Sequence, residues 1–238
     1  MKHMGLIVGA LLAAVLAACS AVPPPAATGV VARLDAPPAW QHFTLPGKRS
    51  THYSAQRMDA REVVHARADG SASLWRQQLR VAPDDMGLLH FSWKVPGLIA
   101  NADMAVRETD DSPVRIVLAF DGDRSKLSSK SQALSDLARA LTGEELPYAT
   151  LMYVWSNAQP TESLILNPRT DRIRKIVVES GDGQLNQWLD YTRDVRADYE
   201  RAFGEAPGAL LSVALMTDAD NTQSQTVAWY GPVKLNQR

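Results

Sequence analysis

The chain has 238 residues, of which 45% are hydrophobic and 21% charged, and its formal net charge at pH 7 is −1. This composition excludes a disordered chain, which would have fewer hydrophobic residues and a larger net charge, and it allows a sizeable core. The balance of 25 basic and 26 acidic residues also argues against nucleic acid as a partner, because such proteins present an excess of lysine and arginine.

The first residues are typical of an exported protein. Lys2 and His3 precede a continuous apolar run at residues 5–16. A membrane-spanning helix needs about 20 residues, so this run is too short to cross a bilayer and instead has the length of a signal peptide's hydrophobic part. The run ends in Leu16-Ala17-Ala18-Cys19, which resembles the lipobox of bacterial lipoproteins.

The lipobox resemblance implies a lipid anchor. Residues 1–18 would be a signal peptide, and cleavage would leave Cys19 at the N-terminus, acylated with fatty acids such as palmitate. Ser20 follows in place of an aspartate, which by resemblance implies the periplasmic side of the outer membrane. The alternative is an ordinary secretory signal cut after Ala18, with no lipid on Cys19.

A short linker is predicted between the anchor and the folded domain. Residues 19–36 are small and mostly uncharged, and Pro23-Pro24-Pro25 favours an extended spacer. One domain is predicted at residues 37–238. Because Cys19 is the only cysteine, the domain has no internal disulfide and depends on its hydrophobic core.

Most of the domain follows the two-residue period of β-strands. The predicted strands are residues 61–67, 73–81, 90–95, 114–120, 149–155, 163–166, 173–178, 209–216 and 226–235. The first two flank residues 68–71, a Gly-containing segment that predicts a turn between them.

Two segments have helical spacing instead. Residues 129–141 place apolar side chains on one helix face, and residues 195–203 do the same before Gly204, a plausible helix stop. Many short strands with two short helices predict a mainly β protein, a jelly-roll-like β-sandwich.

Residues from about 89 to 235 resemble a bacterial family catalogued as domain of unknown function 3047. The matching segments are Phe91-Ser92-Trp93-Lys94-Val95, Asp110-Asp111-Ser112-Pro113-Val114-Arg115, Leu151-Met152-Tyr153-Val154-Trp155, Trp188, Arg193-Asp194-Val195, Asp198-Tyr199, Phe203-Gly204 and the run from Met216 to Thr222. The resemblance implies an envelope-associated β-sandwich similar in shape to carbohydrate-binding modules. It implies no established reaction.

Asp110, Asp111 and Arg115 are the first candidate site. Adjacent side chains on a strand point to opposite faces, so the two carboxylates cannot easily share one ligand atom. A guanidinium inside an apolar strand needs a partner or a wet face. One interpretation is an Arg–Asp pair that fixes a sheet edge, and the other is a polar clamp for a sugar or carboxylate.

The oxygen-rich run Asp218-Ala219-Asp220-Asn221-Thr222 is the second candidate. Asp218 and Asp220 are weak candidates for a structural calcium site, since Ca²⁺ takes six to eight oxygens. The run lacks the glycine and distant glutamate of an EF-hand loop. A turn stabilised by its own side chains and a ligand contact are the alternatives.

Aromatic side chains on the predicted strands are the third candidate. Tyr153 and Trp155 share one face of their strand. Exposed on a concave sheet they would stack on sugar rings, whereas inside the sandwich they would be core. Trp93, Trp229 and Tyr230 lie in other predicted strands, and Trp188 precedes the second helical segment.

Catalytic signatures are weak. The sequence has no G-x-S-x-G elbow, no histidine pair at zinc-ligand spacing and no glycine-rich phosphate loop. No catalytic residue and no cofactor other than the calcium is therefore predicted. A polysaccharide-acting enzyme would need two carboxylates across a cleft, and the candidates are Glu108, Asp110, Asp111, Glu179 and Asp218.

The favoured hypothesis is a non-catalytic binding module for a glycan or other cell-envelope ligand. Its predicted contacts are Asp111, Arg115, Tyr153, Trp155 and Asp220. The alternatives are a structural or assembly lipoprotein that docks onto another envelope protein, and the polysaccharide-acting enzyme.

Overall fold

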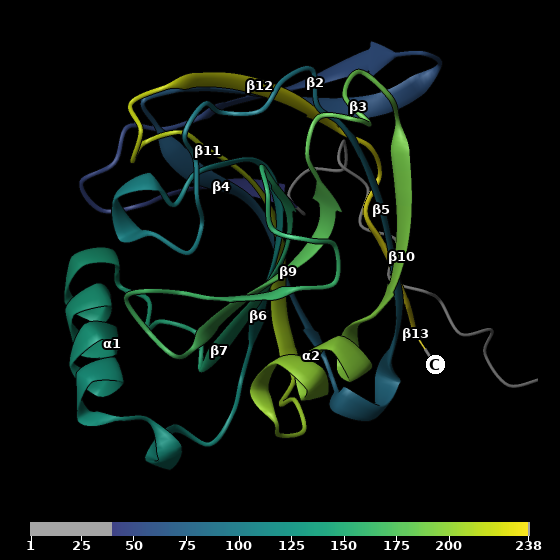
Figure 1. Cartoon of the computed structure of the whole chain (residues 1–238). Helices are drawn as coiled ribbons and strands as arrows, with labels where there is room; N and C mark the ends of the chain where they lie inside the picture. Colours follow the sequence, from purple (N-terminus) through teal and green to yellow (C-terminus); the bar gives the residue numbers. More distant parts are fainter. Residues whose placement is uncertain (1–39, 238) are drawn as a thin grey trace, which may run out of the picture.

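The computed structural model describes residues 40–237, which form two packed β-sheets and two short helices (Figure 1). The signal peptide, the acylated Cys19 and the proline-rich linker are predictions for residues outside this range. Among the described residues, no helix combines the length and the hydrophobicity that crossing a bilayer requires.

Seven strands form the larger sheet. In spatial order they are β1 (Trp40–Thr44), β4 (Ala72–Val81), β11 (Leu210–Asp218), β6 (Ser112–Phe120), β7 (Ala149–Ser156), β9 (Ile173–Ser180) and β8 (Leu164–Leu166). Neighbouring strands are antiparallel except β7 and β9, which are parallel.

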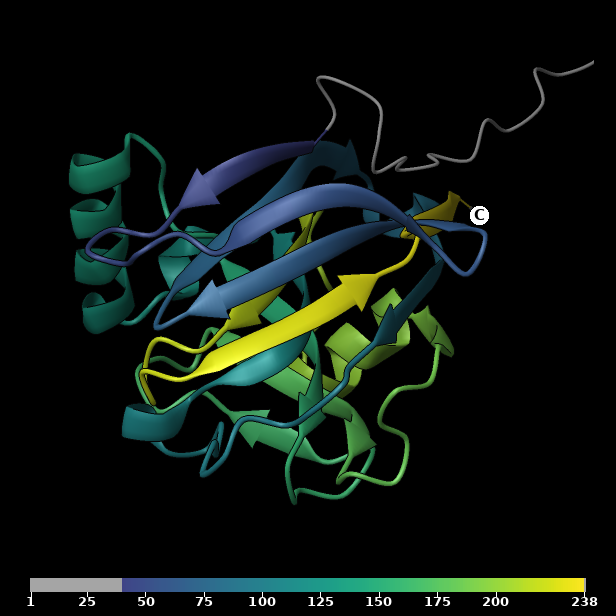
Figure 2. The ribbon, with the colours of Figure 1, turned by 90° about the horizontal axis from the view of Figure 1, so that it is seen from above.

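The smaller sheet lies across the core from the larger one. Its strands in order are β10 (Leu189–Asp194), β5 (Met86–Lys94), β12 (Gln225–Tyr230), β3 (Arg61–Asp69) and β2 (His52–Met58), and β13 (Lys234–Gln237) also pairs with β5. Figure 2 shows β12, in yellow, running beside the blue strands β3 and β2.

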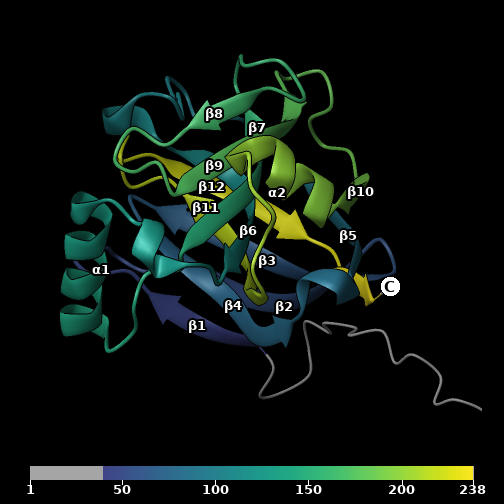
Figure 3. The same ribbon diagram turned by 90° about the horizontal axis from the view of Figure 1, so that it is seen from below.

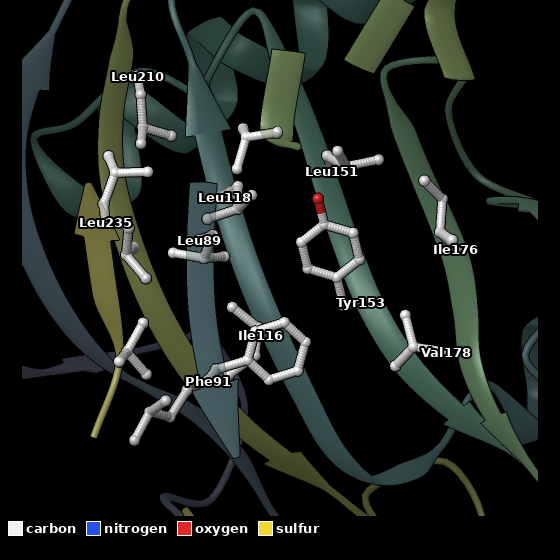
Figure 4. Close-up of a cluster of buried hydrophobic side chains, with 14 of the residues drawn as sticks. Leu89, Phe91, Ile116, Leu118, Leu151, Tyr153, Ile176, Val178, Leu210 and Leu235 are labelled. Carbon is white, nitrogen blue, oxygen red and sulfur yellow. The ribbon is translucent and has the colours of Figure 1, made fainter. Parts of the chain in front are cut away.

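The core lies between the sheets because alternate residues of each strand point inward. Ile116 and Leu118 of β6 and Tyr153 of β7 point toward Leu89 and Phe91 of β5 (Figure 4). All five side chains are at most 2% exposed. The predicted β-sandwich with two short helices is thus confirmed.

The two helices make different contacts. Helix α2 (Val195–Phe203) inserts Tyr199 into the core, with its ring 4.7 Å from that of Phe120. Helix α1 (Ser129–Thr142) buries only Ser131 and Ser135, and lies on the side of the larger sheet away from the core (Figures 1 and 3). Its apolar stripe is therefore largely open to solvent.

Two strand predictions need correction. Residues 61–67 and 73–81 are strands, but β3 pairs with β2 and β12, whereas β4 pairs with β1 and β11. The chain crosses between sheets at Gly70, whose φ is +51°, so the intervening turn joins no hairpin. Residues 226–235 form two strands, because Pro232 has no amide hydrogen for a sheet ladder and β12 ends at Tyr230.

Candidate functional site

A cleft of about 700 Å³ lies on the outer face of the larger sheet. Inward positions of β6 belong to the core, so Val117 and Ala119 point outward to the cleft floor. Ala214 and Met216 of β11 and Met152 of β7 extend the floor on both sides. The floor is therefore a continuous apolar surface across three central strands.

A loop that we call the strap, residues 143–147, crosses over this floor. Glu144 accepts two hydrogen bonds from Arg76 of β4, at 2.8 and 2.9 Å. The strap precedes β7, and β6 and β11 lie between β7 and β4, a span of roughly 14 Å at the usual strand spacing. The ion pair thus fastens the strap across the cleft, which gives the cleft a floor and a roof.

Buried charges form the end of the cleft where β6 begins and β11 ends. Arg115 projects from β6 and donates to Asp110 (3.2 Å) and pairs with Asp218 (2.9 Å). Lys175 of β9 donates to both oxygens of Asp110 (2.7 Å each) and to the carbonyl of Met104 (2.9 Å). Arg115 is 2% exposed and Lys175 is fully buried, so the network is closed to solvent.

The charges within this network shift one another's pKa values. Burial alone would raise the pKa of Asp110, but the charges of Arg115 and Lys175 outweigh it and hold that pKa below its usual value. Burial and the nearby charge of Arg115 lower the pKa of Lys175 to about 8. Burial raises the pKa of Asp218. The network therefore centres on the ionised Asp110.

Of the two interpretations of Asp110, Asp111 and Arg115, the structure supports the Arg–Asp pair, but this pair lies at the start of the central strand β6 and not at a sheet edge. Both aspartates precede β6, which begins at Ser112, so the expectation for adjacent strand positions does not apply, and Asp111 bonds to a different partner. It accepts from the amide of Asn221 (3.1 Å) and from the amide and hydroxyl of Thr222 (2.7 and 2.6 Å). Asp111 is 1% exposed, so it anchors this loop and is not available to a ligand.

The predicted calcium residues lie close together. Ligand atoms of Asp111, Asp218 and Asp220 are within 4.8 Å of one another. Arg115 already pairs with Asp218, and Lys48 pairs with Asp220. A calcium ion would have to displace both cations, so the residues present fit the ion poorly. Asp220 itself lines the cleft.

The prediction that Tyr153 and Trp155 stack on a ligand is wrong. They are 0% and 1% exposed and lie on the inner face of β7 (Figure 4 shows Tyr153). The Tyr153 hydroxyl donates to Asp198 (2.9 Å), and Trp155 Nε1 donates to the carbonyl of Gly181 (2.9 Å). Both polar atoms are satisfied inside the protein, so the rings belong to the core.

Sequence reasoning missed the cleft floor and the strap. Small side chains such as Ala119 and Ala214 have no chemical signature of a site. The available signal was the alternation of β6, in which Val117 and Ala119 face away from the core side chains. This alternation alone does not predict a cleft, because the cleft also depends on where β4, β11 and α1 lie relative to β6.

Every carboxylate that lines the cleft within residues 40–237 is paired with a cation. The pairs are Asp110 with Arg115 and Lys175, Asp121 with Arg80, Glu144 with Arg76, Glu145 with Arg124 and Arg139, Asp218 with Arg115, and Asp220 with Lys48. Hydrolysis by two carboxylates needs one as a proton donor and one as a base or nucleophile. These paired groups give that reaction little support.

Solved structures with a similar arrangement include three glycan-acting proteins. The xyloglucanase domain of NopAA from Sinorhizobium fredii, solved with cellobiose, aligns with a TM-score of 0.44 and 8% identity over 84% of this chain and 93% of its own. A cellulase derived from Cel12A of Rhodothermus marinus gives 0.44 and 10% over 84% and 97%. Endoglucanase 3 of Trichoderma harzianum, from family GH12, gives 0.43 and 8% over 84% and 95%.

A search of curated proteins gives no match. The family model described as "Protein of unknown function (DUF3047)" matches residues 38–234. This span includes strands β1 to β12 and every residue that lines the cleft. The chain therefore belongs to the DUF3047 family.

Proposed function

We propose that the protein is a non-catalytic binding module of the bacterial cell envelope that holds a ligand with an apolar body in the cleft. The observation that supports this most is the cleft itself, about 700 Å³ under the strap with an apolar floor. Sites for small ligands are concave, mostly apolar and about 300–1,000 Å³ in volume, with a few polar groups that orient the ligand.

The chemistry of the floor favours an apolar body over a bare glycan. Met152 and Met216 are flexible side chains that adapt to varied apolar shapes. A sugar buried there would leave hydroxyls without partners, at a cost of about 1–3 kcal/mol for each group. The aromatic rings of Phe43 and Tyr148, which line the cleft, offer little free face on which a sugar could stack. The guanidinium of Arg76 lies over the ring of Phe43, 4.1 Å from its centroid, and Tyr148 is 4% exposed.

Titration with a fluorescent apolar probe tests this function. We expect the mature chain, residues 19–238 without acyl groups, to bind such a probe saturably at one site, because the floor removes apolar surface from water. The readout is probe fluorescence against protein concentration. Absence of saturable binding by a correctly folded sample would contradict the proposal.

The envelope location is part of the proposal and depends on Cys19. We expect Cys19→Ser to move the protein from the membrane fraction to the soluble fraction, since stable anchoring requires the acyl chains. Cell fractionation and labelling with a palmitate analogue are the measurements, and Ser20→Ala is the matched control. Palmitate labelling that persists in Cys19→Ser would overturn the lipid anchor at Cys19.

A further inference from the structure

We propose that the cleft's ligand is a single-chain amphiphile whose anionic head lies beside Arg169. This inference rests on the proposed function and adds the chemical class of the ligand. It follows from the apolar floor of the cleft and from which of the charged groups that line the cleft lack a counter-charge.

Polar side chains line the cleft at both ends, and Arg169 belongs to one of these ends. The end is formed by the start of β6, the end of β11, the loop after β1 and the loop after β8. Its polar lining residues are Lys48, Asp110, Arg115, Asn167, Arg169, Asp218, Asp220 and Asn221. The floor beside it is Val117, Met152 and Met216. A ligand with an apolar chain and a polar head matches this order.

Arg169 is the cation that the surrounding protein leaves uncompensated. The other four cations lining the cleft each have a carboxylate partner: Lys48, Arg76, Arg115 and Arg124. For Arg169, the interactions within residues 40–237 show no ion pair, and its guanidinium donates only to the carbonyl of Arg107, at 3.4 Å. Its backbone amide donates to Asn167 (2.9 Å), which fixes the start of this loop at the cleft wall.

The carboxylates at this end of the cleft are already paired with other cations. Asp110 pairs with both Arg115 and Lys175. Asp218 pairs with Arg115 at 2.9 Å, and Asp220 pairs with Lys48. Within residues 40–237, none of these carboxylates forms an ion pair with Arg169, so its guanidinium is the group at this end that can receive an anion.

An anionic head is the natural partner for this guanidinium. Carboxylate and phosphate oxygens match the fork of N–H donors on arginine, and hydrogen bonds between ionised groups are stronger than neutral ones. A hydroxyl head would gain less binding free energy from Arg169, and a cationic head would be repelled by it.

Competition between amphiphiles of equal chain length tests the proposal. Dodecanoate, dodecyl phosphate, dodecanol and dodecyl maltoside would compete with the fluorescent probe for the mature chain. Each is used below its critical micelle concentration or, for dodecanol, below its solubility limit. We expect the two anionic amphiphiles to bind about three- to tenfold more tightly than dodecanol. Arg169→Gln should bring that ratio close to one, while Arg57→Gln, an exposed arginine on β2, should leave it unchanged.

The outcomes separate the inference from the function on which it rests. Equal affinity for dodecanol and both anions, or an anion preference that survives in Arg169→Gln, would overturn the head-group assignment and leave the apolar body intact. Tightest binding of dodecyl maltoside would replace the anionic head with a sugar. If no amphiphile displaces the bound probe, the ligand is not a single-chain amphiphile, although the cleft still binds the apolar probe. The two anions compared with each other distinguish a carboxylate from a phosphate head.

Discussion

Val117→Trp is expected to weaken ligand binding at least about 100-fold. Val117 lies at the centre of the cleft floor, between Met152 of β7 and Ala214 of β11 in the strand pairing. An indole at this position would occupy the space that the ligand's apolar body needs, and a ligand cannot share that volume without clashes that cost more than the roughly 2.7 kcal/mol behind a 100-fold loss. The measurement is titration with the apolar probe.

A matched control separates the lost cleft from a damaged fold. Leu166 of β8 is 57% exposed on the same sheet and does not line the cleft. Leu166→Trp should bind the probe as the wild type does. Circular dichroism and Tm should show that both variants are folded. Undiminished binding by a folded Val117→Trp protein would place the ligand elsewhere.

Asp110→Ala should lower the free energy of unfolding by about 3–5 kcal/mol, the usual cost of removing one partner from a buried ion pair. Asp110 is 4% exposed and contacts both Arg115 and Lys175. Without it, Lys175 keeps only the carbonyl of Met104. Lys175→Met should cost less, because Asp110 would still pair with Arg115. Urea unfolding of the three proteins is the measurement.

The pH dependence of the same variants follows from the lowered pKa of Asp110. A carboxyl whose pKa is lower in the folded state stabilises the protein fully above its unfolded pKa, about 3.9, and this stabilisation is lost as pH falls through the folded pKa. The stability gap between wild type and Asp110→Ala should therefore narrow below about pH 4. A gap that stays constant at acid pH, or Lys175→Met as the less stable variant, would contradict the central role of Asp110.

The sequence predicted strands and helices where local patterns were strong. Residues 195–203 coincide with α2, and the apolar run at residues 114–120 lies within β6. Alternation also placed Tyr153 and Trp155 on one face of β7. It did not say which face was inside, because β7 is central and every residue along it is buried. The choice depends on the position of β5, which no local pattern specifies.

Local sequence patterns also do not predict which strands pair with one another. The segment around Gly70 has the composition of a hairpin turn, yet it carries the chain from one sheet to the other. The cleft arises from this arrangement: β4 joins the larger sheet, so Arg76 stands across from the strap and binds Glu144. The ion pair of Arg115, in contrast, could be predicted from the sequence. A charged residue in an apolar strand needs a partner wherever the strand lies, and Asp110 is near in sequence.

A crystal structure of the mature chain with 12-bromododecanoate tests the central claim most directly, because anomalous scattering locates the bromine without ambiguity. We expect one bromine peak above Val117 and beneath residues 143–147, with the carboxylate toward Arg169. A fully occupied bromine site on any other surface, with the space under residues 143–147 free of the chain, would contradict a ligand held in the cleft.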